Sequence, residues 1–113
     1  MNYPLLKDRE LTEKEITYDI RQWLRYKGIF HWKVWQGPLS KNGVSDILGI
    51  LPGGRLLAVE VKTNRGRVSP LQQLFLDAIN RKGGLAFVAR SVDEVRMEVD
   101  NAIRDRGLQS CRE

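Results

Sequence analysis

Two apolar segments joined by a short turn constrain the fold of this 113-residue chain more than any other feature. Residues 44–51 and 55–62 have the composition of β-strands, and Pro52-Gly53-Gly54 between them is typical of a hairpin turn. A turn of three residues fixes the register and places Asp46 directly opposite Glu60 on the same sheet face. A turn of two or four residues would place a valine opposite Asp46, so the pairing of the two carboxylates depends on the turn length.

Capping signals and apolar periodicity predict the other elements. Thr12 with Glu15, and Ser69 with Gln72, are capping-box patterns that begin helices. The predicted elements are a helix at 12–27, a strand at 29–36, the two hairpin strands, a helix from Ser69 to Gly83, a strand at 85–89 and a helix from Ser91 that closes at Gly107. The order α-β-β-β-α-β-α predicts an α/β fold in which a mixed β-sheet is flanked by helices.

The same periodicity predicts which side chains form the core. The predicted inner face of the second long helix consists of Leu71, Leu74, Phe75, Ala78 and Ile79. In the strand at 29–36, alternation places Phe30, Trp32 and Val34 on one face. Of the three tryptophans Trp23, Trp32 and Trp35, two fit the core pattern, and we expect them to pack in the core rather than to form a dimer surface.

Cysteine and histidine are too scarce for several classes of site. Cys111 is the only cysteine and His31 the only histidine, which excludes an intramolecular disulfide, a zinc site of paired cysteines and a multi-histidine metal site. A bound metal would need oxygen ligands, the donors typical of magnesium, manganese and calcium. No glycine-rich nucleotide-binding motif is present. With no apolar run near the roughly 18 residues of a membrane span and no signal peptide, we expect a cytoplasmic protein.

The excess positive charge is concentrated in the middle of the chain. The formal net charge is +5, and residues 33–67 contribute +4 of it. The charged side chains of this segment are Lys33, Lys41, Arg55, Lys62, Arg65 and Arg67, against Asp46 and Glu60. A local basic surface favours a polyanion such as nucleic acid, although a net charge of this size also keeps a small domain soluble.

The predicted pairing of Asp46 with Glu60 is costly unless a cation is bound. Two like charges about 5 Å apart repel by roughly 3 kcal/mol at an effective dielectric constant of 20. A divalent cation between the two carboxylates would offset this repulsion, and the backbone carbonyl of Val61 could be a further oxygen ligand. Lys62, on the same face as Glu60, could act on water or on charge that develops on a substrate. The groups together are those of metal-assisted hydrolysis, whereas Glu-x-Lys alone is more often a surface salt bridge.

Three motifs in order resemble a known nuclease superfamily. They are Gly43-Val44-Ser45-Asp46, Glu60-Val61-Lys62 and Ser69-Pro70-Leu71-Gln72. Together they resemble the PD-(D/E)xK nucleases, and most closely the small stand-alone members of the virus-type replication-repair nuclease (VRR-NUC) family. The resemblance covers roughly residues 11–90, and Ser45 stands where the superfamily motif has proline.

The resemblance implies both a fold and an activity. It implies a restriction-endonuclease-like domain over residues 1–113, with a core at about 11–106. It implies hydrolysis of DNA phosphodiesters with Mg²⁺ or Mn²⁺ as cofactor, with Asp46 and Glu60 as metal ligands and Lys62 as a catalytic residue. Small stand-alone members of this kind resemble homodimeric Holliday-junction resolvases, so a homodimer that acts on branched DNA is expected.

The family also has a glutamate in its first helix and a glutamine in the helix after Glu-x-Lys. Glu13 follows the core-facing side of the first predicted helix, whereas Glu15 is occupied as the partner of Thr12 in the capping box. We therefore choose Glu13 as the outer metal or water ligand, with Glu15 second; both could instead be ordinary first-turn acids that the helix dipole favours. Gln72 matches the glutamine, and it also completes the capping box of Ser69, so both roles can hold.

The basic residues Lys41, Arg65 and Arg67 flank the predicted active strands and are the candidates for phosphate contacts, the alternative being solvated loop charge. We predict a divalent-metal-dependent, structure-specific DNA endonuclease that acts on branched DNA such as Holliday junctions. No basic recognition helix is visible, which favours readout of structure over sequence. The alternatives are a non-catalytic nucleic-acid-binding module and a sequence-specific restriction-type endonuclease.

Overall fold

The computed structural model of the chain describes residues 10–35, 37 and 42–111, with side chains described as far as residue 105. The elements are α1 (Glu13–Tyr26), β1 (Phe30–Lys33), β2 (Ile47–Ile50), β3 (Leu56–Val61), α2 (Pro70–Arg81), β4 (Leu85–Ala89) and α3 (Val92–Cys111). The predicted order α-β-β-β-α-β-α and the mixed α/β class are therefore confirmed. None of the described helices is both long enough and apolar enough to cross a membrane.

Local signals place the beginnings of the helices well and the ends of some elements less well. Both predicted capping boxes are present, with Thr12 at the start of α1 and Ser69 at the start of α2. The prediction that Gly107 ends the last helix is wrong, because α3 continues to Cys111. A glycine inside a helix costs about 1 kcal/mol without ending it. The strands β1 and β2 are also shorter than predicted.

The sheet has the strand order β1-β2-β3-β4. Strands β1, β2 and β3 pair antiparallel, and β4 joins β3 in parallel. The pair of Ile50 with Leu56 and the pair of Ile47 with Val59 have the register that a three-residue turn requires, so the predicted hairpin register is confirmed. Gly53 and Gly54 both adopt positive φ angles, of 90° and 89°, which side chains other than glycine rarely tolerate.

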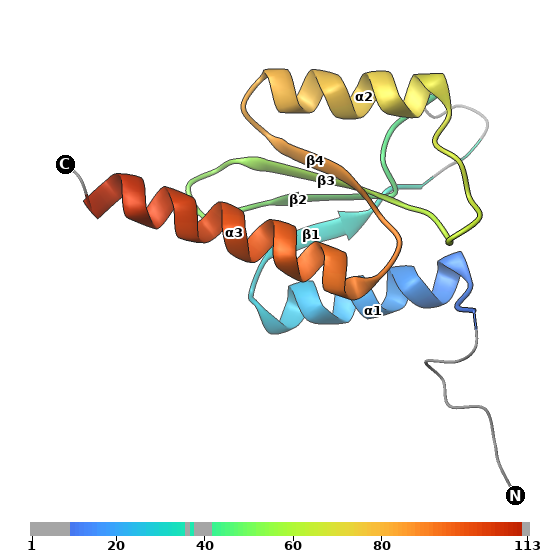
Figure 1. The fold of residues 1–113 in the computed structure, drawn as a ribbon, viewed down its shortest axis with the longest axis horizontal. Coiled ribbons are helices and arrows are strands. Elements are labelled where there is room, and N and C mark those ends of the chain that lie inside the picture. The colour runs from blue at the N-terminus through green and yellow to red at the C-terminus, as the bar shows by residue number, and fades with distance from the viewer. Residues whose placement is uncertain (1–9, 36, 38–41, 112–113) are drawn as a thin grey trace, which may run out of the picture.

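Helices cover the two faces of the sheet unequally. Helices α1 and α3 lie on one face and α2 lies on the other (Figure 1). The larger core cluster lies beneath α1 and α3, and its fully buried side chains include Ile20, Leu24, Ile47, Leu57, Val59, Val61, Val95 and Val99. The smaller cluster lies beneath α2 and contains Ala58, Leu76 and Ala86. The chain thus holds the end of β3 between helices on both faces.

The predicted inner face of α2 is confirmed for Phe75 and Ile79 and is wrong for Leu71 and Leu74. Leu71 and Leu74 are 52% and 59% exposed, whereas Leu76 is buried. The inward stripe follows Gln72, Phe75, Leu76 and Ile79, at the i, i+3, i+4, i+7 spacing of one helix face. The residue that begins this stripe is the polar Gln72, and its inward position concealed the true face from a reading based on apolar residues alone.

Within residues 10–35, 37 and 42–105, no helix covers the sheet face opposite α1 over β1. Phe30 and Trp32 lie on this face with exposed fractions of 69% and 39%, so the expectation of core packing is wrong for Trp32. Helix α2 packs over β3 and β4 and does not extend to β1. Trp23 packs partly buried against the larger core cluster, and Trp35 is exposed.

Candidate active site

The predicted site residues gather where β3 ends, beside the first turns of α1 and α2 (Figure 1). The segment that leads into β2 packs closely against the start of α2. A Cβ atom on Gly43 would lie 2.7 Å from the carbonyl oxygen of Leu71, and Gly43 has a φ of 87°. Only glycine fits this approach without strain. The close contact fixes the path of the chain through the buried Ser45 to Asp46.

Glu60 is a buried acid at the centre of the site. Its side chain is held on the α2 face of the sheet, and the residue is 2% exposed. Its Oε1 accepts a hydrogen bond from Nε2 of Gln72 at 2.9 Å and lies 3.7 Å from Nζ of Lys62. Its Oε2 is buried and receives no hydrogen bond from an N–H or hydroxyl donor of the described residues. The neighbouring acid is Asp46, which forms a side-chain hydrogen bond with the Glu60 carboxyl when one of the two is protonated. Two acids held this close favour a bound cation in place of the shared proton.

Asp46 reaches Glu60 in a different way from the one predicted. It lies in a bend just before β2, beyond the last strand pair of Ile47 with Val59, so it is not a cross-strand partner of Glu60 on one sheet face. Instead its Oδ2 accepts the backbone N–H of Val61 at 2.8 Å, while its backbone carbonyl accepts the N–H of Val34 at 2.8 Å. The chain bends because the Asp46 side chain takes the position that a continued β2 backbone would occupy.

The capping of Val61 by Asp46 also orients the Val61 carbonyl. In a β-strand, the N–H and C=O of one residue point to the same side of the strand. The N–H of Lys62 points the other way, to the carbonyl of Ala89 in β4. The carbonyl of Val61 is therefore turned to the side on which Asp46 lies, as a further ligand role requires.

Burial and like charge make Glu60 a weak acid. Burial of the side chain, followed by the nearby charge of Asp46, raises the pKa of Glu60 from 4.5 to about 8. The ammonium of Lys62 opposes this rise, whereas a side-chain hydrogen bond with Asp46 and the charge of Glu13 add to it. Glu60 therefore carries a proton at pH 7 in the metal-free protein. A cation that binds there must displace this proton, which makes its affinity depend on pH.

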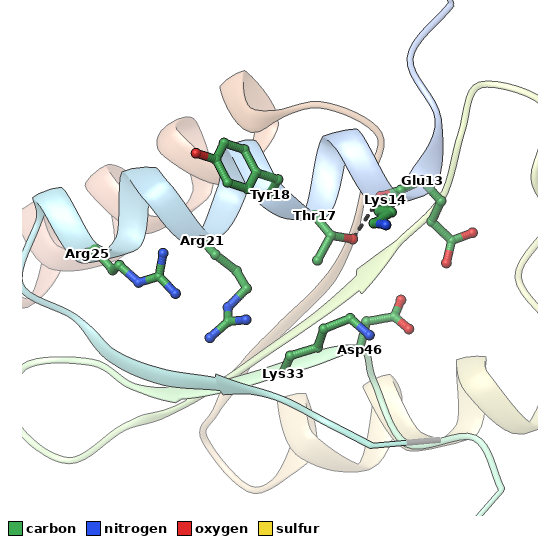
Figure 2. Close-up of a pocket in the computed structure, with 8 residues that line it drawn as sticks. All are labelled: Glu13, Lys14, Thr17, Tyr18, Arg21, Arg25, Lys33 and Asp46. Carbon is green, nitrogen blue, oxygen red and sulfur yellow. Dashed lines mark hydrogen bonds between the residues drawn. The ribbon is translucent and has the colours of Figure 1, made fainter. Parts of the chain in front are cut away.

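Of the two glutamates in the first turn of α1, Glu13 faces the site. Its carboxylate and that of Asp46 lie toward each other across one end of a groove (Figure 2). Glu15 instead accepts the backbone N–H of Thr12 at 3.1 Å in the capping box. The hydroxyl of Thr17, one turn after Glu13, donates to the Glu13 carbonyl at 2.8 Å and is buried.

Gln72 takes both of the positions considered for it. Its Oε1 accepts the backbone N–H of Ser69 at 2.9 Å, and its Nε2 donates to Glu60. The two bonds use opposite ends of one amide, so the capping box fixes the orientation of the group that contacts Glu60.

The predicted phosphate contacts are located less closely. Arg65 and Arg67 are exposed in the loop between β3 and α2, and Nε of Arg65 lies 3.7 Å from Oε1 of Glu10. Lys41 lies outside the described residues. Arg90, which the sequence did not single out, donates through Nη1 to the carbonyls of Thr63 and Gly66. It thereby ties the loop after Lys62 to the end of β4.

A groove of about 480 Å³ between α1 and β1 leads to the two acids Glu13 and Asp46. We call it the α1/β1 groove, and its other lining residues are Lys14, Thr17, Tyr18, Arg21, Arg25 and Lys33. The groove was not predicted from the sequence. A pattern that could have indicated it is present in α1, where Glu13, Thr17, Arg21 and Arg25 recur every four residues and so form a polar stripe beside the apolar one.

The donor atoms at the end of β3 suit a divalent metal ion. The carboxylates of Asp46 and Glu60 and the carbonyl of Val61 are all oxygen donors, which Mg²⁺ and Mn²⁺ prefer. The buried Oε2 of Glu60 accepts no hydrogen bond from an N–H or hydroxyl donor of the described residues, so it can serve as a ligand. Within the part of the chain that the structure describes, no group of three or more His, Cys, Asp or Glu side chains is compact enough to hold a metal. A metal here would therefore rely on a carboxylate pair supplemented by backbone oxygen and water.

Comparisons with known proteins agree on a single family. The family model of the VRR-NUC domain matches residues 4–93. A solved structure described as a VRR_NUC domain has a TM-score of 0.65 and 24% identity, covering 78% of this chain and 94% of that chain. A second, described as a VRR_NUC domain protein, has a TM-score of 0.63 and 20% identity, covering 77% of this chain and 84% of that chain. No curated protein matches the chain. With four-fifths of the sequence inside the family model and the same fold in these structures, the chain belongs to the VRR-NUC domain family.

Proposed function

We propose that this protein is a divalent-metal-dependent endonuclease that hydrolyses phosphodiester bonds of branched DNA, as one nuclease domain with a core at about residues 11–106. Membership of the VRR-NUC family implies a nuclease-type function with DNA as substrate. The observation that carries the proposal further is the buried Glu60, which lies beside the acid Asp46 and has Lys62 and Gln72 on its Oε1. Two acids held side by side in a buried place repel each other unless they share a proton or bind a cation.

Each side chain of the site has a separate role in this proposal. Asp46 and Glu60, with the carbonyl of Val61, would hold Mg²⁺ or Mn²⁺, and such an ion polarises phosphoryl oxygens and lowers the pKa of water. Gln72 holds Glu60 in place through its amide N–H. The side chain of Lys62 is mostly buried beside Glu60, where its ammonium orients the attacking water or stabilises negative charge on the phosphate. Glu13 serves as the outer ligand that accepts a proton from water.

The loop after β3 supplies further contacts to DNA in the proposal. Arg65 and Arg67 are exposed beside the site, and Lys41 belongs to the segment that precedes Asp46. Each of these cations would contact a backbone phosphate and steepen the salt dependence of binding.

A panel of labelled DNAs tests the proposed activity. A four-way junction, a flap, a single strand and a linear duplex are incubated with the protein and with Mg²⁺, Mn²⁺ or EDTA, and the products are resolved on a denaturing gel. We expect cleavage of the branched DNAs with either metal and none with EDTA. Cleavage of linear duplex at fixed sites would favour a restriction-type enzyme instead. Binding without any cleavage would leave a nucleic-acid-binding module.

We also propose that the protein acts as a homodimer through the uncovered face of β1 and β2. Phe30, Trp32 and Ile50 are all exposed on this face, and the rings of Phe30 and Trp32 lie 5.7 Å apart. An exposed apolar patch on a small domain is typical of an interface. A twofold dimer uses the same patch on both copies, which matches the pairing of two active sites with the two strands of a junction.

Phe30→Ser should weaken this dimer at least tenfold, because a twofold axis places the lost ring in the interface twice. Sedimentation velocity across a concentration series measures the dissociation constant. Tyr26→Ser is the matched control, since Tyr26 is also an exposed aromatic residue but lies at the end of α1. Equal dissociation constants for the two variants would remove this face from the interface.

A further inference from the structure

The cations of the α1/β1 groove form no ion pair with a described residue. Within residues 10–35, 37 and 42–105, the side chains of Lys14, Arg21, Arg25 and Lys33 take part in no ion pair. Surface cations are often paired with neighbouring carboxylates, and four that converge unpaired on one groove create a local positive potential. Such a groove attracts a ligand with several negative charges.

Arg21 gives the clearest sign of a missing ligand. Its guanidinium points from α1 into the groove, toward the strand that carries Lys33 (Figure 2). The residue is half-buried, and its Nε is fully buried without an acceptor among the described residues. A buried donor without an acceptor is energetically unfavourable. An anionic oxygen bound in the groove would remove this cost.

The charges are ordered along the groove. The acids Glu13 and Asp46 stand at the end that meets the proposed active site, and Arg21 and Arg25 follow toward the other end of α1 (Figure 2). Lys33 extends along the groove toward Asp46 from the opposite wall, because odd-numbered side chains of β1 face α1. From Glu13 to Arg25 the helix rises about 18 Å, which about five stacked nucleotides span at 3.4 Å each.

We propose that the α1/β1 groove binds the phosphate backbone of one DNA strand and leads it to the active site. The inference rests on the proposed function, because DNA is the polyanion that the nuclease site would cut. Arg21, Arg25 and Lys33 contact successive phosphates, and Lys33 contacts the phosphate nearest the acids. These contacts read no bases, so the groove contributes affinity and position without sequence preference.

The salt dependence of DNA binding tests the groove separately from cleavage. Binding of a fluorescein-labelled four-way junction is measured by anisotropy in EDTA, at several KCl concentrations between 50 and 200 mM. The double variant Arg21→Gln/Arg25→Gln should make the negative slope of log K against log[KCl] shallower by about 1.8, and should lower the affinity about ten- to a hundredfold. The control Arg81→Gln/Arg104→Gln removes the same charge from exposed helical positions outside the groove, and its slope should not change.

A second variant guards against an effect of folding. Arg25→Gln/Lys33→Gln changes only exposed side chains. It should reproduce the shallower salt dependence of binding with an unchanged melting temperature. Equal slopes for groove and control variants, with tight binding by the natural protein, would overturn the groove inference and leave the nuclease proposal standing. If the slope depended on the groove cations but the protein cut none of the DNAs, the groove inference would stand and the nuclease proposal would be overturned. Failure of the natural protein to bind any DNA would overturn both.

Discussion

Lys62→Ala should reduce the rate of DNA cleavage by about 10²–10³-fold or more while leaving DNA binding nearly unchanged. Removal of one preorganised donor to the developing charge has this effect in hydrolytic sites. The Lys62 side chain is mostly buried beside Glu60, 3.7 Å from its Oε1, so its charge acts within the site rather than on the outer surface of bound DNA. Single-turnover cleavage with Mn²⁺ measures the rate, and anisotropy in EDTA measures binding.

Lys82→Ala is the matched control for this substitution. Lys82 is exposed at the end of α2, far along the helix from the site, and its loss should change the cleavage rate less than threefold. If Lys62→Ala retained cleavage within threefold of the natural protein, Lys62 would have no part in the reaction. A parallel loss of binding and cleavage would make it a DNA contact rather than a catalytic group.

Glu60→Gln should abolish metal-dependent cleavage and, in the metal-free protein, increase stability at alkaline pH. The folded protein holds the Glu60 proton up to about pH 8, whereas the unfolded chain loses it near pH 4.5. Between pH 4.5 and pH 8, a rise in pH therefore favours the unfolded state. The free energy of unfolding of the natural protein falls by about 1.4 kcal/mol per pH unit from this group alone. Glutamine has no proton to lose, so the gain from the substitution grows from pH 5 to pH 8.

Urea unfolding in EDTA at pH 5 and pH 8 measures this difference, which should reach a few kcal/mol at the higher pH. Mn²⁺ should raise the melting temperature of the natural protein and not that of Glu60→Gln, since only a ligand of the folded state stabilises it. Glu98→Gln, on the exposed surface of α3, is the control and should change neither quantity. Two results together would argue against a metal on Glu60. The melting temperature of the natural protein would not respond to Mn²⁺, and the stability difference between Glu60→Gln and the natural protein would be the same at pH 5 and pH 8.

The features that the sequence predicts well are those set by local rules. A three-residue turn determines the register of its hairpin, and the pair of Ile50 with Leu56 follows. A serine or threonine three residues before an acid or amide determines a capping box, and both boxes are present. The position of Glu13 beside Asp46, with Glu15 turned to the cap, follows from the same local rule, and the ligand role of Glu13 stays a prediction.

The features that escape prediction depend on how elements far apart in sequence pack together. The bend at Asp46 depends on its side chain replacing a backbone partner of Val61 in another strand. Phe30 and Trp32 are exposed because α2 packs over β3 and β4 and does not extend to β1. The alternation of side chains within β1 carries no information about how far α2 extends. The α1/β1 groove requires Lys33 and Arg21 to face each other across two elements.

The amide of Gln72 couples the integrity of α2 to the conformation of Glu60. Because the same group closes the helix start and steadies the carboxylate, fraying of the first turn of α2 would release the acid at the same moment. The free energy that keeps this turn wound is thus also the free energy that keeps the acid preorganised. Local unfolding of this one helical turn would therefore remove the hydrogen bond that positions Glu60, while the rest of the fold stayed intact.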